Sequence, residues 1–150
     1  MRRRIQLISD EEIREILRRH TTVAVVGLSR NPSKASYEVT EYLQSKGYRI
    51  VPINPMADEI LGEKSYDSLL ELPEELKSSV ESVDLFRPSE AVLPFVEDVI
   101  KLREEYGAPD VIWMQLGIVN EVAAEKARNA GMTVIMDRCM KVEHRRLLSQ

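Results

Sequence analysis

The side chains best suited to binding chemistry are concentrated in one polar loop, Ser29 to Lys34, which follows an apolar run ending at Gly27. The loop leads into a predicted helix, and the free N–H groups and dipole of a helix N-terminus favour a phosphate. The hydroxyl groups of Ser29, Ser33 and Ser36 add donors, and Arg30 and Lys34 add positive charge. Taken alone, the loop predicts either a phosphate site or a capped helix start with solvated basic residues.

The same loop departs from the dinucleotide fingerprint G-x-G-x-x-G, because Ser29 and Pro32 stand where further glycines are expected. NAD-binding domains usually place Asp or Glu after the second strand, where the carboxylate binds a ribose hydroxyl. This sequence has Asn54-Pro55 there, and neither residue is acidic. The pattern disfavours NAD and suits a ligand with an extra phosphate near the adenine-side ribose, as in NADP or coenzyme A (CoA).

Groups that could serve as nucleophiles or metal ligands are few and scattered. His20 and His144 have no partner pattern near them, so we interpret them as surface or capping residues. No Cys/His cluster has metal-ligand spacing, and no G-x-S-x-G or Walker sequence occurs. Cys139 is the only cysteine, and the neighbouring Arg138 favours its thiolate. Either Cys139 forms a mixed disulfide with CoA, or it is a buried structural cysteine.

The elements that must position these residues follow from apolar periodicity, which alternates between strand-like and helix-like runs. The predicted strands are 23–26, 49–53, 82–86, 111–114 and 133–136. A capping box at Ser9 and Glu12 predicts the first helix. The second predicted helix runs from residue 35 to Gly47, and the third covers 69–76. The fourth begins after a break between Ser89 and Pro94 and ends at about Glu105. The last two run from an Asn120 cap to Ala130 and over 140–148.

These elements predict the α/β class, with a doubly wound, Rossmann-like parallel sheet of five strands in the order 3-2-1-4-5 and helices on both faces. We expect residues 1–150 to form a single domain, with residues 1–20 as an N-terminal helix packed on it. A ligand should lie beyond the carboxyl ends of the strands, at the switch between strands 1 and 4. Pro52 lacks a ladder donor and should lie where that donor is not needed.

Composition limits the class of partner. The chain has 150 residues, 43% apolar and 31% charged, with a net charge of -4, so a globular fold is expected and nucleic acid is disfavoured as a partner. Arg2 to Arg4 could contact RNA, although a solvated terminus is the simpler interpretation. No stretch approaches the roughly 18 apolar residues of a membrane span, and the acidic residues after Ser9 disfavour a signal peptide. A cytoplasmic location without membrane contact is expected.

The sequence resembles a known family in five segments that occur in the expected order. They are 25–29 with Pro32, Gly47-Tyr48 with 51–55, 83–87, 113–118 and 137–139. This pattern resembles the small stand-alone CoA-binding proteins, a family related to the CoA-binding domain of the succinyl-CoA synthetase alpha subunit. The resemblance extends over nearly the whole chain, and the Asn54-Pro55 and Trp113-Gln115-Gly117 pieces are its most specific parts.

The resemblance implies a role for each part of the predicted site. Gly27, Ser29 and loop 30–34 would hold the pyrophosphate, with Arg30 or Lys34 facing a phosphate. Asn54 and Pro55 would lie near the adenosine, residues 86–88 would line the adenine side, and residues 115–117 would follow the pantetheine arm. The full set of predicted ligand-binding residues is Gly27, Leu28, Ser29, Arg30, Asn31, Pro32, Ser33, Lys34, Ser36, Asn54, Pro55, Phe86, Arg87, Pro88, Gln115, Leu116, Gly117 and Arg138.

The leading functional hypothesis is a module that binds CoA or acyl-CoA without catalysis, as a carrier, a sensor or a subunit. A second hypothesis is an NAD(P)-linked redox protein, which the broken glycine fingerprint disfavours. A third is a ligand-free interaction or scaffold protein. For aromatic stacking on adenine, Phe86 at a strand end is a better candidate than Trp113, which lies inside a predicted strand and is expected in the core.

Overall fold

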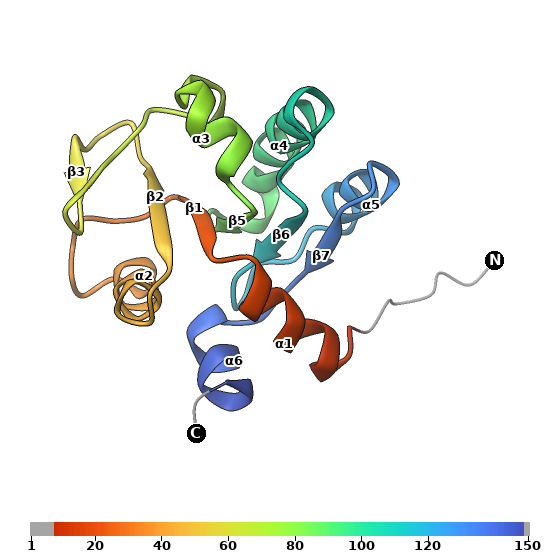
Figure 1. Cartoon of the computed structure of the whole chain (residues 1–150), viewed down its shortest axis with the longest axis horizontal. Helices are drawn as coiled ribbons and strands as arrows, with labels where there is room; N and C mark the ends of the chain where they lie inside the picture. Colours follow the sequence, from red (N-terminus) through yellow and green to blue (C-terminus); the bar gives the residue numbers. More distant parts are fainter. Residues whose placement is uncertain (1–7, 149–150) are drawn as a thin grey trace.

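The computed structural model describes residues 8–148 and is built around a five-stranded sheet in which every neighbouring pair of strands is parallel (Figure 1). The sheet consists of β1 (Thr22–Val26), β2 (Arg49–Ile53), β5 (Ser82–Leu85), β6 (Val111–Met114) and β7 (Thr133–Ile135). The α-helices are α1 (Asp10–Arg19), α2 (Ala35–Ser45), α3 (Glu74–Ser79), α4 (Val92–Tyr106), α5 (Glu121–Asn129) and α6 (Met140–Leu147).

The helices cover both faces of the sheet and create two apolar cores. Helices α3, α4 and α5 pack on one face, and α1, α2 and α6 pack on the other (Figure 1). Strand β1 shows why: Ala24 and Val26 enter the first core, whereas Val23 and Val25 enter the second. A strand buried on both faces must be continuously apolar, as this one is. The predicted α/β class with a doubly wound parallel sheet is confirmed.

The sheet runs in the order β2-β1-β5-β6-β7. The segment predicted as the third strand, 82–86, therefore lies beside β1 as β5 and not outside β2. The place outside β2 is taken by an isolated parallel bridge between Ile53 and Tyr66. Counted with that bridge as the third strand, the order begins 3-2-1-4-5, which is the predicted order, but the segment 82–86 takes the fourth place in it rather than the third, and β7 extends the sheet. The switch point lies between β1 and β5, and Pro52 is in β2, at one edge of the five-stranded sheet.

Two predicted helix starts are confirmed by their hydrogen bonds. The Ser9 hydroxyl accepts from the Glu12 N–H at 3.1 Å, and the capping box at α1 is complete. The Asn120 side chain accepts from the Ala123 N–H at 3.0 Å and begins α5. The predicted break before α4 is also present, because a 3₁₀ turn, η2 (Ser89–Ala91), precedes it. Ser89 does not cap α4; its oxygen accepts from the Val119 N–H at 2.9 Å.

The segment between β2 and β5 is more divided than predicted. The turn at Gly62 joins a short antiparallel hairpin of β3 (Glu59–Ile60) and β4 (Glu63–Lys64). The single helix predicted over 69–76 is instead a 3₁₀ turn, η1 (Leu69–Glu71), followed by α3. Pro73 lies between them as the N-cap residue of α3, where its missing N–H is tolerated.

Burial corrects several expectations about individual side chains. The apolar pattern of α2 predicts a buried face of Ala35, Val39, Tyr42 and Leu43, but Ala35 is exposed, and Ser36 and Thr40 are buried in that helix instead. His144 is buried rather than at the surface, with its Nδ1 2.8 Å from the Tyr42 hydroxyl. His20 is the C-cap residue of α1. Trp113 is fully buried, as predicted.

Two predictions concern features away from the sheet. Arg2, Arg3 and Arg4 lie outside the described residues, so their proposed contact with RNA stays a prediction. Among residues 8–148, no helix has the length and apolar character needed to cross a membrane.

Candidate functional site

Three cavities follow one another along the carboxyl ends of the strands. Cavity A, of about 380 Å³, lies at the ends of β1 and β2. Cavity B, of about 420 Å³, lies at the ends of β5 and β6 beside α2, and cavity C, of about 370 Å³, lies at the ends of β6 and β7. Arg87 lines both A and B, and Leu116 and Cys139 line both B and C. The three cavities therefore lie in a row along the strand ends, with neighbouring cavities sharing wall residues.

Gly27 forms the point where the chain leaves β1 and passes closest to β5. Its φ is +82°, and a Cβ placed there would lie 2.8 Å from the Phe86 carbonyl oxygen and 3.1 Å from Cδ of Arg87. Only glycine combines this backbone conformation with so close an approach. The residue therefore opens cavity A between the ends of the two central strands.

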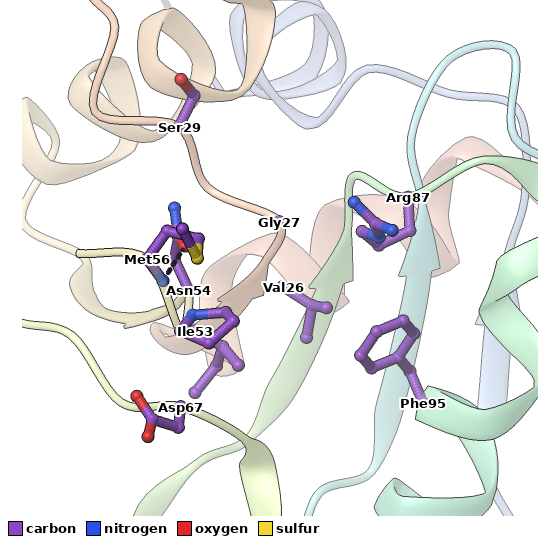
Figure 2. Close-up of a pocket in the computed structure, with 10 residues that line it drawn as sticks. Val26, Gly27, Ser29, Ile53, Asn54, Met56, Asp67, Arg87 and Phe95 are labelled. Atoms are coloured by element: carbon purple, nitrogen blue, oxygen red, sulfur yellow. Dashed lines mark hydrogen bonds between the residues drawn. The ribbon is translucent and has the colours of Figure 1, made fainter.

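Arg87 and Phe95 lie on one side of Gly27, and Asn54 and Met56 lie on the other (Figure 2). Arg87 follows β5 and is exposed, so its guanidinium is available to a ligand. Phe95 comes from the first turn of α4 and is half-buried in the wall of cavity A. Cavity A thus combines an apolar wall with one cationic side chain at its border with cavity B.

The Asn54 side chain joins the loops that follow β1 and β2. Its Nδ2 donates to the Leu28 carbonyl oxygen at 2.9 Å, and its Oδ1 accepts from the Met56 N–H at 2.8 Å. The backbone N–H of Asn54 also donates to the Tyr66 carbonyl oxygen at 2.9 Å. Both ends of the amide are therefore engaged within the protein, and Asn54 shapes cavity A while lining it.

The polar loop after β1 is held by its own side chains. The Ser29 N–H donates to the Ser36 hydroxyl at 2.9 Å, and the Asn31 N–H donates to the Ser29 hydroxyl at 3.0 Å. The Oδ1 of Asn31 accepts from both the N–H of Ser33, at 3.0 Å, and its hydroxyl, at 2.9 Å. These bonds fix the loop before any ligand arrives, while Arg30 and Lys34 stay exposed.

A buried carboxyl group lies behind cavity B. Asp84 is fully buried in β5, and its Oδ1 accepts from Nε2 of Gln115, which lines the cavity. Oε1 of Gln115 accepts from the Met140 N–H at 3.1 Å and so holds the start of α6. Burial raises the pKa of Asp84 to about 8, although the Gln115 hydrogen bond acts to lower it. Within residues 8–148, the Oδ2 atom has no hydrogen-bond partner.

The loops after β6 and β7 are joined around cavity C. Asp137 adopts a φ of +59°, and its Oδ1 accepts from the Gly117 N–H at 2.7 Å. The indole N–H of Trp113 donates to the Arg138 carbonyl oxygen at 2.7 Å. Cys139 is half-buried at the wall shared by cavities B and C, so it is not the fully buried residue expected of a structural cysteine. Its mixed disulfide with CoA stays a prediction.

Nine of the predicted site residues line cavities A and B. They are Gly27, Ser29, Asn54, Pro55, Phe86, Arg87, Pro88, Gln115 and Leu116. Arg138 joins them in cavity C. The remaining predicted residues line none of the three cavities: Leu28, Arg30, Asn31, Pro32, Ser33, Lys34, Ser36 and Gly117. Among these, Leu28 and Ser36 are buried, and residues 30–34 are exposed beside the site.

The sequence interpretation missed several cavity residues. Asp67, Phe95 and Met56 line cavity A, and Val142 and Met136 line cavity C. Asp67 matters most, because it brings a carboxylate to a cavity for which the end of β2 supplies none. It belongs to the irregular stretch after the hairpin, so no pattern placed it there. In the described part of the chain, no group of three or more His, Cys, Asp or Glu residues could hold a metal ion.

The fold and the elongated strand-end site define a nucleotide-binding α/β protein, and sequence comparison makes this class specific. A family model described as "CoA binding domain" matches residues 21–145. The chain therefore belongs to this CoA-binding domain family, as the resemblance predicted.

Known relatives include proteins of the same size. The chain is 43% identical over 136 residues to the uncharacterized protein YneT of Bacillus subtilis, covering 91% of this chain and 94% of YneT. The crystal structure of Prb, described as PH1109 protein redesigned for binding, superimposes with a TM-score of 0.87 at 38% identity and covers 98% of this chain and 97% of its own. A hypothetical protein from Pyrococcus horikoshii superimposes with a TM-score of 0.85 at 37% identity, covering 99% of both chains.

A more distant relative is a large enzyme. The ADP-forming acetate–CoA ligase II of Archaeoglobus fulgidus is 38% identical over 64 residues. That match covers 41% of this chain but only 10% of the ligase. The likeness therefore concerns one segment that a small binding protein and a ligase have in common.

Proposed function

We propose that this protein binds CoA or an acyl-CoA along cavities A to C, as a carrier, sensor or subunit without a catalytic group of its own. The observation that carries this proposal is the row of three neighbouring cavities, in which A and B share Arg87 and B and C share Leu116 and Cys139. CoA is an elongated ligand with an adenosine, a pyrophosphate and a pantetheine arm, and such a ligand suits an elongated site. Membership of the CoA-binding domain family supports the same ligand.

The ligand would lie across the switch point between β1 and β5. Its pyrophosphate would be near Gly27, Ser29 and the start of α2, where helix N–H groups and the dipole favour an anion. Arg30 or Lys34 would contact the 3′-phosphate from the exposed loop. The pantetheine arm would pass through cavity B along Gln115 and Leu116, and its thiol would approach the wall of cavity C.

An NAD(P) ligand is the second candidate, and Asp67 is the observation that favours its NAD form. Its carboxylate lines cavity A, so it could accept hydrogen bonds from ribose hydroxyls in place of the missing acidic residue after β2. The same carboxylate would repel a phosphate on that ribose. The two candidates therefore differ in whether an extra ribose phosphate strengthens binding or weakens it.

Isothermal titration with CoA, 3′-dephospho-CoA and NAD separates these candidates. We expect CoA to bind, dephospho-CoA to bind roughly tenfold or more weakly, because a charged hydrogen bond contributes about 1.5–3 kcal/mol, and NAD not to bind. Preference for NAD would support the redox candidate. Absence of binding by all three ligands would contradict both and favour a ligand-free scaffold.

The cation at the 3′-phosphate can be identified with the same ligands. The two variants to test are Arg30→Gln and Lys34→Gln. The variant that lacks the cation in contact with the 3′-phosphate should bind CoA and dephospho-CoA with equal affinity. Lys46→Gln is a matched control, because Lys46 is an exposed lysine at the opposite end of α2. If both loop variants keep the full preference for CoA, neither residue contacts the 3′-phosphate.

A further inference from the structure

Cavity C lies beyond the point where the CoA thiol would end. The pantetheine arm in cavity B would reach Leu116 and Cys139, and these two residues are also walls of cavity C. Anything attached to the sulfur would continue in the same direction and enter cavity C. The assignment of cavity C rests on the proposed CoA function. It concerns the group attached to the CoA sulfur and not CoA itself.

The wall of cavity C includes apolar side chains that remain in contact with solvent. Leu116 is 71% exposed and Val142 is 56% exposed, and Met136, which lines the same cavity, is half-buried. Isolated exposed apolar residues are ordinary, but these three line one cavity beside a proposed ligand site. Covering them with an apolar group would remove their surface from water and would strengthen binding.

The charged residues that line cavity C are two carboxylates, Asp137 and Glu143, and one guanidinium, Arg138. Arg138 forms an ion pair with Glu143 at 2.5 Å, and Arg146 forms a second one with Glu143 at 2.7 Å. Burial acts to raise the pKa of Glu143, but hydrogen bonds from Arg146 and Arg138 outweigh it and hold the pKa below its usual range. Asp137 adds a second carboxylate to the lining. Arg138 is the cation that the lining contains, and its guanidinium is engaged with Glu143, so an incoming carboxylate would have to compete for it.

We propose that cavity C holds the acyl group of a CoA thioester and selects short, apolar, uncharged acyl groups over dicarboxylic ones. Leu116, Met136 and Val142 supply the apolar contact. The carboxylate of Asp137, and the pairing of Arg138 with Glu143, disfavour an acyl group that ends in a carboxylate. The ligand class is thus a short-chain fatty acyl-CoA, and free CoA occupies only part of the site.

The test is a titration series with CoA and with acetyl-, propionyl-, butyryl- and succinyl-CoA. Each added methylene should tighten binding, by at most about fourfold if it is fully buried. Succinyl-CoA has as many acyl carbons as butyryl-CoA but ends in a carboxylate. It should bind about tenfold or more weakly than butyryl-CoA, because its charge would be desolvated without a partner.

A pair of valine variants tests whether cavity C is responsible. Val142→Ser should flatten the increase in affinity from acetyl- to butyryl-CoA, with each affinity expressed relative to that of the same variant for CoA. Val122→Ser is the matched control, because Val122 is 58% exposed on α5 and lines none of the three cavities. That variant should keep the whole increase. Both substitutions are at exposed positions, so folding is not at risk.

The outcomes separate this inference from the function on which it rests. If CoA binds but affinity does not rise with acyl length, or succinyl-CoA equals butyryl-CoA, the acyl assignment is overturned and CoA binding stands. The same holds if Val122→Ser flattens the series as much as Val142→Ser. If neither CoA nor any thioester binds, the proposed function itself fails.

Discussion

At the scale of single residues, Asp84 is the most unusual group in the described part of the chain. It is a fully buried carboxyl in a central strand, and its side-chain hydrogen bond comes from the neutral amide of Gln115. Burial raises its pKa from the ordinary value of 3.8 to about 8, so the folded protein favours the protonated acid. Its contribution to stability is full below about pH 4 and is lost as the pH rises toward 8.

Asp84→Asn should remove this pH dependence, because an amide resembles the protonated acid and does not ionise. The unfolding free energy of the variant should rise relative to the native protein by up to about 1.4 kcal/mol per pH unit between pH 4 and 8. Urea titrations at several pH values measure this difference. Parallel pH profiles for the two proteins would contradict the assignment.

Gly27 has a conformation and an environment that exclude other residues. Gly27→Ala should lose roughly 1–2 kcal/mol of stability for its left-handed backbone. It should lose more because the new Cβ would meet the Phe86 carbonyl oxygen at 2.8 Å. The variant should also bind CoA more weakly, since Arg87 would be displaced.

Gly47→Ala provides the matched control for this position. Gly47 has a similar φ of +91°, but a Cβ added there would meet nothing within 4 Å. It should therefore lose only the backbone contribution and keep its CoA affinity. Equal losses of stability in the two variants, measured by urea unfolding, would show that the contact with Phe86 is unimportant.

At the scale of elements, the N-cap of α5 joins this helix to the turn before α4, in addition to the packing of its buried alanines. Asn120 accepts from the Ala123 N–H, and its Nδ2 donates to the Ser89 carbonyl oxygen at 3.0 Å. Asn120→Ala should lose about 1 kcal/mol for the cap and about 1 kcal/mol for the second bond. Ser9→Ala removes only the exposed cap of α1 and should lose about half as much. Urea midpoints that rank the two variants in the opposite order would contradict this account.

Most of the helices and strands could be predicted from the sequence, but the place of the segment 82–86 in the sheet could not. Periodicity and caps located the residues of every strand of the five-stranded sheet and most helix ends, because strands buried on both faces are predominantly apolar. The segment 82–86 was given the wrong place in the sheet, since a crossover from β2 can lead to either side of the β1–β2 pair with the same right-handed connection. The short bridge at Tyr66, which occupies the place outside β2, has no apolar run to reveal it.

The site was predictable where it depends on strand ends and not where it depends on irregular segments. Gly27, Asn54 and Arg87 each follow a predicted strand, so fold geometry alone brought them together. Asp67 comes from a segment without periodicity, and its entry into cavity A depends on the hairpin of β3 and β4. The burial of Asp84 was equally hidden, because a single acidic residue in an apolar strand does not reveal which neighbours cover it.

At the scale of the whole molecule, the proposed function depends on the end of the sheet where the strands have their carboxyl termini. The carboxyl ends of the strands carry the three neighbouring cavities, the polar loop 29–34 and exposed basic residues. The opposite end of the sheet consists of the first residues of the strands, such as Thr22, Arg49 and Val111. A ligand should therefore change the environment of residues at the carboxyl ends of the strands and leave residues at the amino ends unchanged.

The most direct test of the central claim is an NMR titration of the ¹⁵N-labelled protein with CoA. We expect amide shifts to change at the carboxyl ends of the strands, at Gly27, Ser29, Arg87 and Leu116, while those of Thr22, Arg49 and Val111 stay constant. Changes confined to the amino ends of the strands, or no changes at millimolar CoA, would contradict the claim that the strand-end cavities bind this ligand.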